Sequence, residues 1–316
     1  MNIYLCIIIA ALLLEFFLHY LSRRLDLKNL NMKLPDEFKN YYSEEEYARS
    51  QEYLRANTQF ALITSSFNLF IILSVILLGL FNVADVWVRN YNLHPIPSGL
   101  IFFGILFFIQ DILSTPFSLY QTFVIEEKFG FNKSTPKIYI LDKIKSYVLI
   151  IIIGGLVLSL ILYFFESFGD LAWLYAWMFI SAFLILIQPL FTLVIAPMFN
   201  TFTALEEGEL KDRIAQYSEK VNFPIRKIDV MDGSRRSSKG NAYFSGLGKS
   251  RRIALFDTLI EKHTVDELLS IIAHEVGHYK KRHNIKGIII ATINSGIMFY
   301  ILSIFINNPQ LFAAFQ

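Results

Sequence analysis

Two histidines four residues apart are the side chains of this sequence best suited to metal chemistry. They stand in the stretch His274-Glu-Val-Gly-His278. On a helix, residues four apart lie on one face, so both imidazoles can converge on one ion, with Glu275 beside the first. In this H-E-x-x-H arrangement two histidines hold Zn²⁺ and the glutamate handles the protons of the attacking water. The alternative is a helix that carries two incidental histidines, and the flanking sequence decides between them.

The residues before the motif predict a helix that positions it. Thr264-Val-Asp-Glu267 is a capping box, which marks a helix start. Apolar residues then recur at helical spacing, at Leu268, Leu269, Ile272 and Val276. The other four histidines are not predicted to be ligands. His283 lies about 140° from His278 around a continuous helix, and the remaining three lie outside it, at His19, His94 and His263.

The composition predicts a polytopic membrane protein. Hydrophobic residues make up 54% of the 316 residues and charged ones only 18%, with a mean hydropathy of +0.45. The net charge of +2 does not favour a nucleic-acid partner, and a single cysteine excludes a disulfide within the chain. Six apolar segments can cross about 30 Å of hydrocarbon, at 3–21, 60–81, 99–124, 147–165, 171–198 and 287–306.

The Lys and Arg residues between these segments predict the orientation. Residues 22–59 carry seven and residues 82–98 carry one, residues 125–146 carry five and 166–170 carry none, and 199–286 carry sixteen. Rich and poor segments alternate, so the rich ones are predicted to be cytoplasmic and the N-terminus to lie outside. The motif therefore falls at the cytoplasmic membrane surface. That surface belongs to the inner membrane in a bacterium and to the endoplasmic reticulum in a eukaryote.

Three regions follow from this pattern: a transmembrane helical region of five spans over 1–198, a soluble insert over 199–286, and the sixth span with the chain end over 287–316. The insert has the character of a small α/β domain. A helix is predicted over 206–221 and strands over 225–231, 243–244 and 252–256. The strand around Asn241, Ala242 and Tyr243 could offer an edge to an extended peptide substrate, or it could be an ordinary core strand.

Two further segments carry polar residues in unusual places. The third span contains Gln110, Asp111, Ser114, Thr115 and Gln121, which either line a watery cavity or hold neighbouring helices together. The loop over 126–135 mixes charges with aromatic residues. Its core, Phe129-Gly-Phe-Asn132, resembles a turn anchored at the membrane interface, but a solvated loop is favoured, with Ser134 or Thr135 capping the segment that follows.

Several motifs in order resemble one family, the type I CAAX prenyl proteases, which are integral-membrane zinc metalloproteases of the M48 class. The resemblance covers most of the chain. It rests on Val124-Ile-Glu126 with Phe129-Gly-Phe-Asn-Lys133, Ala196-Pro-Met-Phe-Asn200, Leu205-Glu-Glu-Gly-Glu-Leu210, Val230-Met-Asp-Gly-Ser-Arg-Arg-Ser237, Asn241-Ala-Tyr-Phe244, Arg252-Ile-Ala-Leu-Phe-Asp-Thr-Leu259 and the motif itself.

The resemblance implies a mainly α-helical membrane protein with a small zincin-like insert and a seventh span beyond the six seen here. It implies one Zn²⁺ per chain, His274 and His278 as its ligands, and Glu275 as catalytic base. It also implies that Asn241 and Ala242 help to align the substrate, and that the substrate is a prenylated protein cleaved at its C-terminal CAAX tripeptide. Membrane lipid is then the other partner, and no nucleic acid is expected.

The sequence departs from the family at the metal site. The family's third ligand is a glutamate in an E-x-x-x-D motif after a seventh span, whereas residues 279–316 contain no Asp or Glu. The expectation is either a C-terminally truncated chain or a third ligand from elsewhere. Two histidines with waters would bind zinc weakly, so the chain as given is expected to be poorly active. The family also often has a histidine just before the Asn-Ala pair, where this chain has Lys239-Gly240.

Three functions are consistent with these residues. The first is a zinc endopeptidase of the CAAX-processing type. The second keeps the chemistry but changes the substrate to misfolded membrane proteins, as in a quality-control metalloprotease. The third is a catalytically silent membrane scaffold, which the absent acidic ligand favours and the intact motif opposes.

Overall fold

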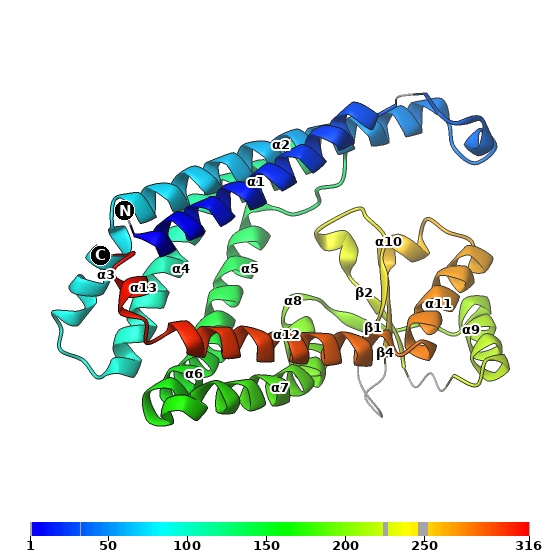
Figure 1. Cartoon of the computed structure of the whole chain (residues 1–316). Coiled ribbons are helices and arrows are strands. Elements are labelled where there is room, and N and C mark those ends of the chain that lie inside the picture. Colours follow the sequence, from blue (N-terminus) through cyan, green and yellow to red (C-terminus); the bar gives the residue numbers. More distant parts are fainter. Residues whose placement is uncertain (1, 32, 224–226, 246–251, 316) are drawn as a thin grey trace. The chain divides into compact units, whose positions relative to one another are not determined.

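The structure is a computed structural model that describes residues 2–31, 33–223, 227–245 and 252–315. The chain is mostly helical (Figure 1), and the prediction of six spans is confirmed. Each helical segment is longer than the apolar stretch that predicted it, because polar turns extend it at one end or both. The six segments are Ile3–Asn29, Glu44–Leu77, Pro95–Glu126, Pro136–Ser167, Gly169–Phe199 and His283–Phe305.

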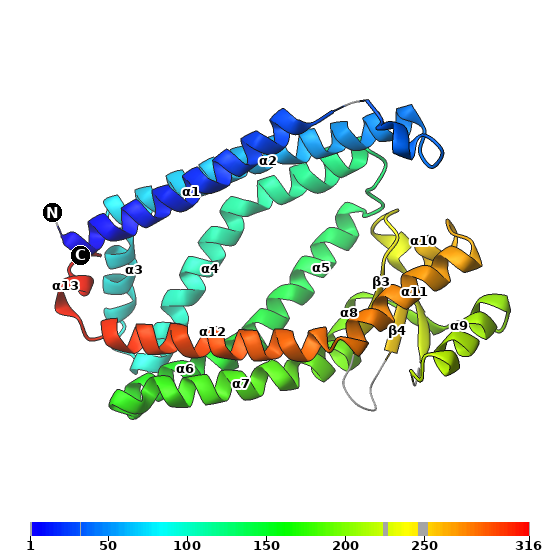
Figure 2. The same ribbon diagram turned by 45° about the vertical axis from the view of Figure 1, so that its right-hand side comes forward.

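Two compact units make up the chain, one of Met1–Gly130 with Ile304–Gln316 and one of Phe131–Ser303. The first unit is entirely helical in its described part. Its α1 lies along α2 (Figures 1 and 2), and α2 begins at a capping box between Ser43 and Glu46. The elements of this unit are α1 (Ile3–Asn29), the 3₁₀ turn η1 (Asp36–Phe38), α2 (Glu44–Leu77), α3 (Leu80–Arg89), α4 (Pro95–Tyr120), the π-helical turn η2 (Gln121–Glu126) and α13 (Pro309–Phe312).

Polar residues in the third span bind the neighbouring helix or their own backbone. Gln121 donates to Asn57 of α2 through Nε2···Oδ1 at 2.7 Å. Ser114 and Thr115 donate to the carbonyl of Asp111 one turn earlier, at 3.0 and 2.6 Å. Of the two alternatives for this span, these contacts favour polar residues that hold helices together.

The loop after this span is anchored at Phe129, whereas its charged residues Glu127, Lys128 and Lys133 are exposed as predicted. Phe129 is only 5% exposed, its ring packs on Tyr53 with centroids 5.1 Å apart, and its carbonyl accepts from Arg49 Nη2 at 3.0 Å. Gly130 has φ +76°, so it turns the chain where a side chain would be strained. The mixed charge and aromatic pattern therefore marks an anchored turn. The capping prediction holds for Thr135, whose side chain accepts from Ile138 N at 3.3 Å.

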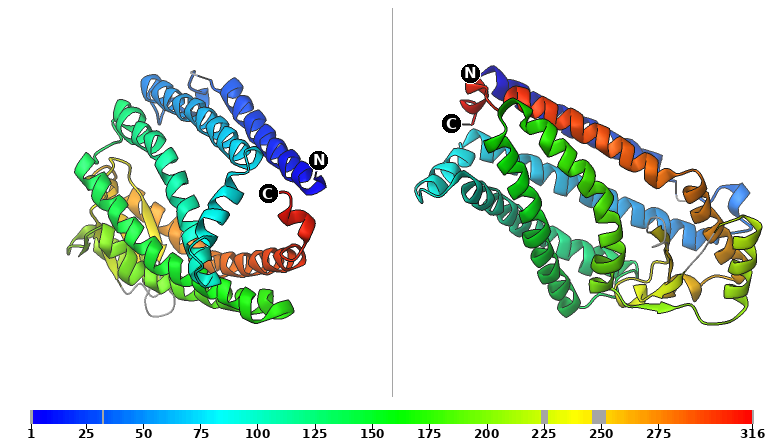
Figure 3. Two further views of the ribbon diagram at one scale, coloured as in Figure 1. Left: turned by 90° about the vertical axis from the view of Figure 1, so that its left-hand side faces the viewer. Right: turned by 90° about the horizontal axis from the view of Figure 1, so that it is seen from below.

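The second unit contains three spans and the soluble insert. In the right-hand view of Figure 3, the sheet lies at the end of this unit where α8 leads into β1 and where α12 begins. The helical elements of this unit are α5 (Pro136–Leu149), η3 (Ile150–Gly154), α6 (Gly155–Ser167), η4 (Gly169–Leu171), α7 (Ala172–Leu190), η5 (Phe191–Ile195), α8 (Ala196–Phe199), α9 (Glu209–Lys220), η6 (Gly233–Arg235), α10 (Asp257–Ile260), α11 (Val265–Lys280) and α12 (His283–Phe305), whose last two residues belong to the first unit.

Close helix packing joins α12 to α7. Trp177 Nε1 donates to the carbonyl of Thr292 at 2.8 Å. Gly296 lies under the same indole, since a Cβ there would meet Trp177 Nε1 at 3.0 Å. A small residue at this crossing lets the two helices approach, as is common between membrane helices.

The insert holds a four-stranded mixed sheet in the order β1-β2-β4-β3. The central pair β2 and β4 is parallel, and both outer pairs are antiparallel. Three strands match the predicted ones, although residues 224–226 lie outside the described part. The first strand was not predicted, because three residues carry too little alternation. The strands are β1 (Phe202–Ala204), β2 (Ile228–Met231), β3 (Ala242–Ser245) and β4 (Arg252–Phe256).

One hydrophobic core joins this sheet to α9 and α11. Ile253 and Leu255 of β4 are 1% and 0% exposed, and Ile214 of α9 is 0% exposed. They pack with Leu268, Ile272 and Val276 of α11 in one cluster. Burial of this apolar face against the sheet fixes the rotation of α11, and therefore the direction of its opposite face.

Candidate active site

The helix α11 presents the motif on its exposed face. Leu268, Ile272 and Val276 recur every fourth residue and are 2%, 0% and 1% exposed, so they define the buried face. His274 and His278 lie on the other side and are exposed. The two histidines are therefore held on a helix whose rotation is set by the packing of its buried face.

The predicted capping box at the start of this helix is present. Thr264 Oγ1 accepts from Glu267 N at 3.4 Å, and Glu267 Oε2 accepts from Thr264 N at 2.8 Å. Hydrogen bonds from Thr264 lower the pKa of Glu267 below its ordinary value. The bond from the backbone N–H has the larger effect and the bond from the hydroxyl the smaller one. A carboxylate in the first turn also complements the helix dipole.

The histidine side chains converge as the spacing predicts. The Nε2 atoms of His274 and His278 lie 3.0 Å apart. Two imidazoles on a tetrahedral zinc, each at about 2.0–2.1 Å, would have their nitrogens about 3.3 Å apart. Only a small opening of the pair is needed to admit the ion, so these residues fit Zn²⁺. Glu275, partly exposed, is the neighbour of His274 on the same helix.

A third histidine reaches the pair in a way that a continuous helix excludes. Arg282 has φ +54°, which ends α11 and starts α12 in a new direction. His283, the first residue of α12, thereby comes to lie with its Nδ1 2.9 Å from Nδ1 of His278. The sequence-based geometry for His283 was wrong because it assumed no break. The contact uses the ring nitrogen opposite to the one that faces His274.

Within the described residues, no group of three His, Cys, Asp or Glu side chains is arranged to hold a metal ion. The third ligand stays a prediction from the family resemblance. Of the remaining histidines, His263 directs Nδ1 to the carbonyl of Leu259 at 3.0 Å.

The strand β3 packs against α11, and it is an outer strand of the sheet. No other described strand pairs with its second side. Asn241 O accepts from Phe256 N at 3.0 Å, so the backbone of Asn241 faces β4 and that of Ala242 points away. The Ala242 N–H already bonds to Asn241 Oδ1 at 2.9 Å. The carbonyl of Ala242 is therefore the group that this edge directs outward beside α11.

Tyr243 lies on the same strand, but its side chain contacts other residues of the sheet. Its hydroxyl contacts Met231 Sδ at 3.8 Å, and its ring lies edge-on to Phe256. Burial raises its pKa, an effect that Arg252 opposes and Asp229 reinforces. Of the three predicted substrate-binding residues, Ala242 directs its carbonyl outward from the edge, Asn241 binds the Ala242 N–H through its side chain, and Tyr243 supports the strand from within the sheet.

A capped helix with a zinc-type histidine pair, an adjacent carboxylate and an open strand edge defines a metallopeptidase, and the six spans make it an integral membrane protein. Residues 24–201 match the family described as CAAX prenyl protease N-terminal, five membrane helices, and residues 204–316 match peptidase family M48. This chain belongs to the membrane-bound M48 metallopeptidases.

Individual relatives agree with this family. CAAX prenyl protease 1 of Saccharomyces cerevisiae is 36% identical over 313 residues, which cover 95% of this chain and 68% of the relative. The Homo sapiens CAAX prenyl protease 1 homolog is 35% identical over 259 residues, which cover 70% of this chain and 54% of the relative. The crystal structure of S. mikatae Ste24p superposes with a TM-score of 0.94 at 34% identity, covering 100% of this chain and 75% of that one. Schizosaccharomyces pombe has a probable CAAX prenyl protease 1 of which this chain spans 65%.

Proposed function

We propose that this protein is a zinc endopeptidase that removes the C-terminal tripeptide from prenylated CAAX proteins at the cytoplasmic membrane surface. The observation that carries the proposal is the convergence of two histidine Nε2 atoms, 3.0 Å apart, on a helix that packs against an open strand edge. The relatives described as CAAX prenyl protease 1 support the substrate class.

His274 and His278 would hold one Zn²⁺ through Nε2, and the family resemblance supplies a glutamate as the expected third ligand. Bound zinc supplies a Lewis acid that acidifies water and polarises the scissile carbonyl. His283 would accept a hydrogen bond from Nδ1–H of His278, because the two atoms lie 2.9 Å apart. Such a bond fixes the tautomer and the ring orientation of a ligating histidine.

The chain's own residues account for binding and proton transfer. An extended substrate would lie along β3, where the outward carbonyl of Ala242 accepts a substrate backbone N–H. Glu275 takes a proton from the attacking water as the new C–O bond forms. It passes the proton to the leaving amine as the C–N bond breaks, so water and peptide give one carboxylic acid and one amine, which at neutral pH are a carboxylate and an ammonium group.

The proposed orientation of the protein in the membrane rests on the distribution of Lys and Arg residues. Segments rich in Lys and Arg alternate along the sequence with segments that carry one or none, and the insert with the motif is the richest. By the positive-inside rule the insert lies in the cytoplasm and the N-terminus outside. The membrane is then the inner membrane of a bacterium or the endoplasmic reticulum of a eukaryote.

The experiment uses the intact chain in lipid vesicles with added zinc and a farnesylated peptide that ends in a CAAX sequence. Mass spectrometry is expected to find the released tripeptide, and Glu275→Gln is expected to abolish its release while zinc binding is retained. Cleavage of unprenylated membrane proteins instead would indicate the quality-control function. If Glu275→Gln does not change the amount of tripeptide released relative to the wild type, the result would indicate a scaffold.

A further inference from the structure

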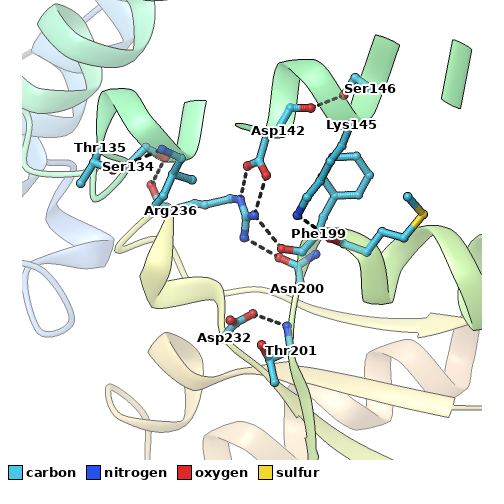
Figure 4. A network of polar contacts seen from close by, with 12 residues as sticks. Ser134, Thr135, Asp142, Lys145, Ser146, Phe199, Asn200, Thr201, Asp232 and Arg236 are labelled. Atoms are coloured by element: carbon cyan, nitrogen blue, oxygen red, sulfur yellow. Dashed lines mark hydrogen bonds and ion pairs between the residues drawn. The ribbon is translucent and has the colours of Figure 1, made fainter. Parts of the chain in front are cut away.

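One arginine of the insert is bound on several sides to α5 and to the end of α8. Arg236 donates to Asp142 of α5 through Nε···Oδ2 at 2.7 Å and Nη2···Oδ1 at 3.0 Å (Figure 4). Its Nη1 donates to Asn200 Oδ1 at 3.0 Å and its Nη2 to the carbonyl of Phe199 at 2.6 Å. A planar guanidinium can serve all these acceptors at once, whereas an ammonium group cannot.

The contacts are partly shielded from water. The side chains of Arg236 and Asp142 are each only 24% exposed. A bidentate ion pair with this burial is more strongly directional than a surface pair, and removal of either partner leaves a charge without its counterpart. The pair is therefore suited to fix a position, and it differs from the exposed ion pairs elsewhere on the insert, such as that of Arg213 with Asp266.

The backbone around Arg236 is joined to the same part of the protein. We call residues 232–240 the docking segment. Arg236 O accepts from Lys133 N at 3.0 Å, and Ser238 N donates to Phe131 O at 3.0 Å. Between them Asn132 and Ser237 form an antiparallel bridge. The docking segment thus continues into strand-like pairing with residues 131–133, which lead into α5.

The first residue of the docking segment is bound to the chain that leaves α8. Asp232 Oδ1 accepts from Thr201 N at 2.7 Å (Figure 4), and Asp232 N donates to Thr201 O at 3.2 Å. Lys145 of α5 adds a bond from Nζ to the carbonyl of Met198 at 2.7 Å. The ends of α5 and α8 and the docking segment therefore form one hydrogen-bonded group.

The other side of the docking segment is fixed to the insert. Ser234 N donates to Asp257 Oδ1 at 2.8 Å, and Thr258 Oγ1 donates to Lys239 O at 3.0 Å. Gly240 lies so close to Leu259 that a Cβ would meet its Cδ1 at 2.8 Å. A displacement at Arg236 is therefore transmitted to Asn241 and to β3, which begins at Ala242.

We propose that Arg236 is a positioning residue that sets which substrate peptide bond is cut, because it holds the β3 edge at a fixed place relative to the ends of α5 and α8. The inference rests on the proposed function. A substrate anchored by a lipid has one end fixed in the membrane, so the place of the edge decides which bond reaches the histidine pair. One residue of an extended peptide corresponds to about 3.3 Å, and an error of about 1 Å can cost roughly a hundredfold in rate.

The test compares Arg236→Lys and Asp142→Asn with the wild type in vesicles, using a farnesylated CAAX peptide and an unlipidated peptide of the same sequence. Arg236→Lys keeps the positive charge and Asp142→Asn keeps the size of the side chain, and each removes the bidentate pair. For the farnesylated peptide we expect kcat/KM to fall about tenfold or more and the products to spread over adjacent bonds. For the unlipidated peptide we expect little change, and zinc content should stay at the wild-type value.

A charge exchange separates positioning from general damage. The double variant Arg236→Asp with Asp142→Arg should recover at least part of the single cleavage site, because the ion pair is restored in reverse. An equal loss on both peptides, loss of zinc, or a single product site in both variants would overturn the inference. A wild-type protein that cleaves neither peptide would contradict the proposed function itself.

Discussion

The two consecutive helices α11 and α12 are both rich in apolar residues, yet different surroundings stabilise them. Three residues of α11 are almost fully buried in the insert core and its first turn is capped. No described residue of α12 is buried, and Ile289 and Ile290 are 52% and 59% exposed to the surroundings that a bilayer would fill. Protein packing therefore orients α11, while lipid accommodates α12. The motif stands on the helix whose rotation is fixed.

The largest effect is expected on the exposed face of α11. Glu275→Gln keeps the shape of the side chain but removes the group that accepts the proton, so kcat should fall by about 10²–10⁴-fold. Zinc stoichiometry, measured by elemental analysis, should not change. As a control, Glu261→Gln alters an exposed residue just after α10 and should leave kcat at the wild-type value. Normal kcat in Glu275→Gln would remove the carboxylate from the mechanism.

On the buried face of α11, Ile272→Ala should lower the free energy of unfolding by about 2–5 kcal/mol, since Ile272 is 0% exposed within the core. The matched change Ile289→Ala in α12 should have a much smaller effect, because lipid tails replace the lost contacts. Both are measured by denaturant unfolding in detergent micelles. Equal losses would mean that the two helices are held in the same way.

The junction between the helices predicts a third effect. His283→Ala removes the contact to His278 Nδ1, and the apparent Kd for zinc should rise roughly tenfold or more. Competition with a chelator of known affinity measures this without any substrate. His263→Ala serves as the control, because that ring bonds to Leu259 O instead. An unchanged zinc Kd in His283→Ala would show that the contact does not orient the ligand.

The smallest effect concerns the glycines of the two helices. A Cβ at Gly277 of α11 or Gly287 of α12 would meet nothing within 4 Å. Gly277→Ala should stabilise the insert by at most about 1 kcal/mol, through helix propensity. Gly287→Ala should change little, because a bilayer already enforces the helix. Thermal unfolding in micelles measures the stability of both variants. A larger gain in stability for Gly287→Ala than for Gly277→Ala would contradict the view that packing holds α11 and lipid holds α12.

Local signals in the sequence were sufficient for much of this structure. The capping box at Thr264 and the four-residue spacing of the apolar positions lie within one helix, so they predict α11 and the convergence of His274 with His278. The six spans follow from hydropathy in the same way. Each of these features depends on neighbours within a few residues.

Two kinds of feature could not be predicted, namely an unusual backbone conformation and contacts with residues distant in the sequence. The place of His283 depends on a left-handed backbone at Arg282, which is unusual for a residue with a side chain. Arg236 lies in a basic segment whose charges indicate only the positive-inside orientation. Its partners Asp142, Asn200 and Phe199 are distant in the sequence and are brought to it by the fold. The loop at Phe129 contains charges, yet its burial comes from side chains about 80 residues earlier in the sequence.

The bond from Ala242 N–H to Asn241 Oδ1 has a consequence for how this protein behaves among its own copies. An open strand edge invites another edge to pair with it, which is a common route to aggregation. Here the donor at the start of the edge is already occupied by its own neighbour, so a second copy meets an interrupted ladder. An extended peptide that offers its own N–H to the remaining carbonyl meets no such obstacle. The Asn241 side chain thus disfavours strand pairing between two copies, while the Ala242 carbonyl stays accessible to a short extended peptide.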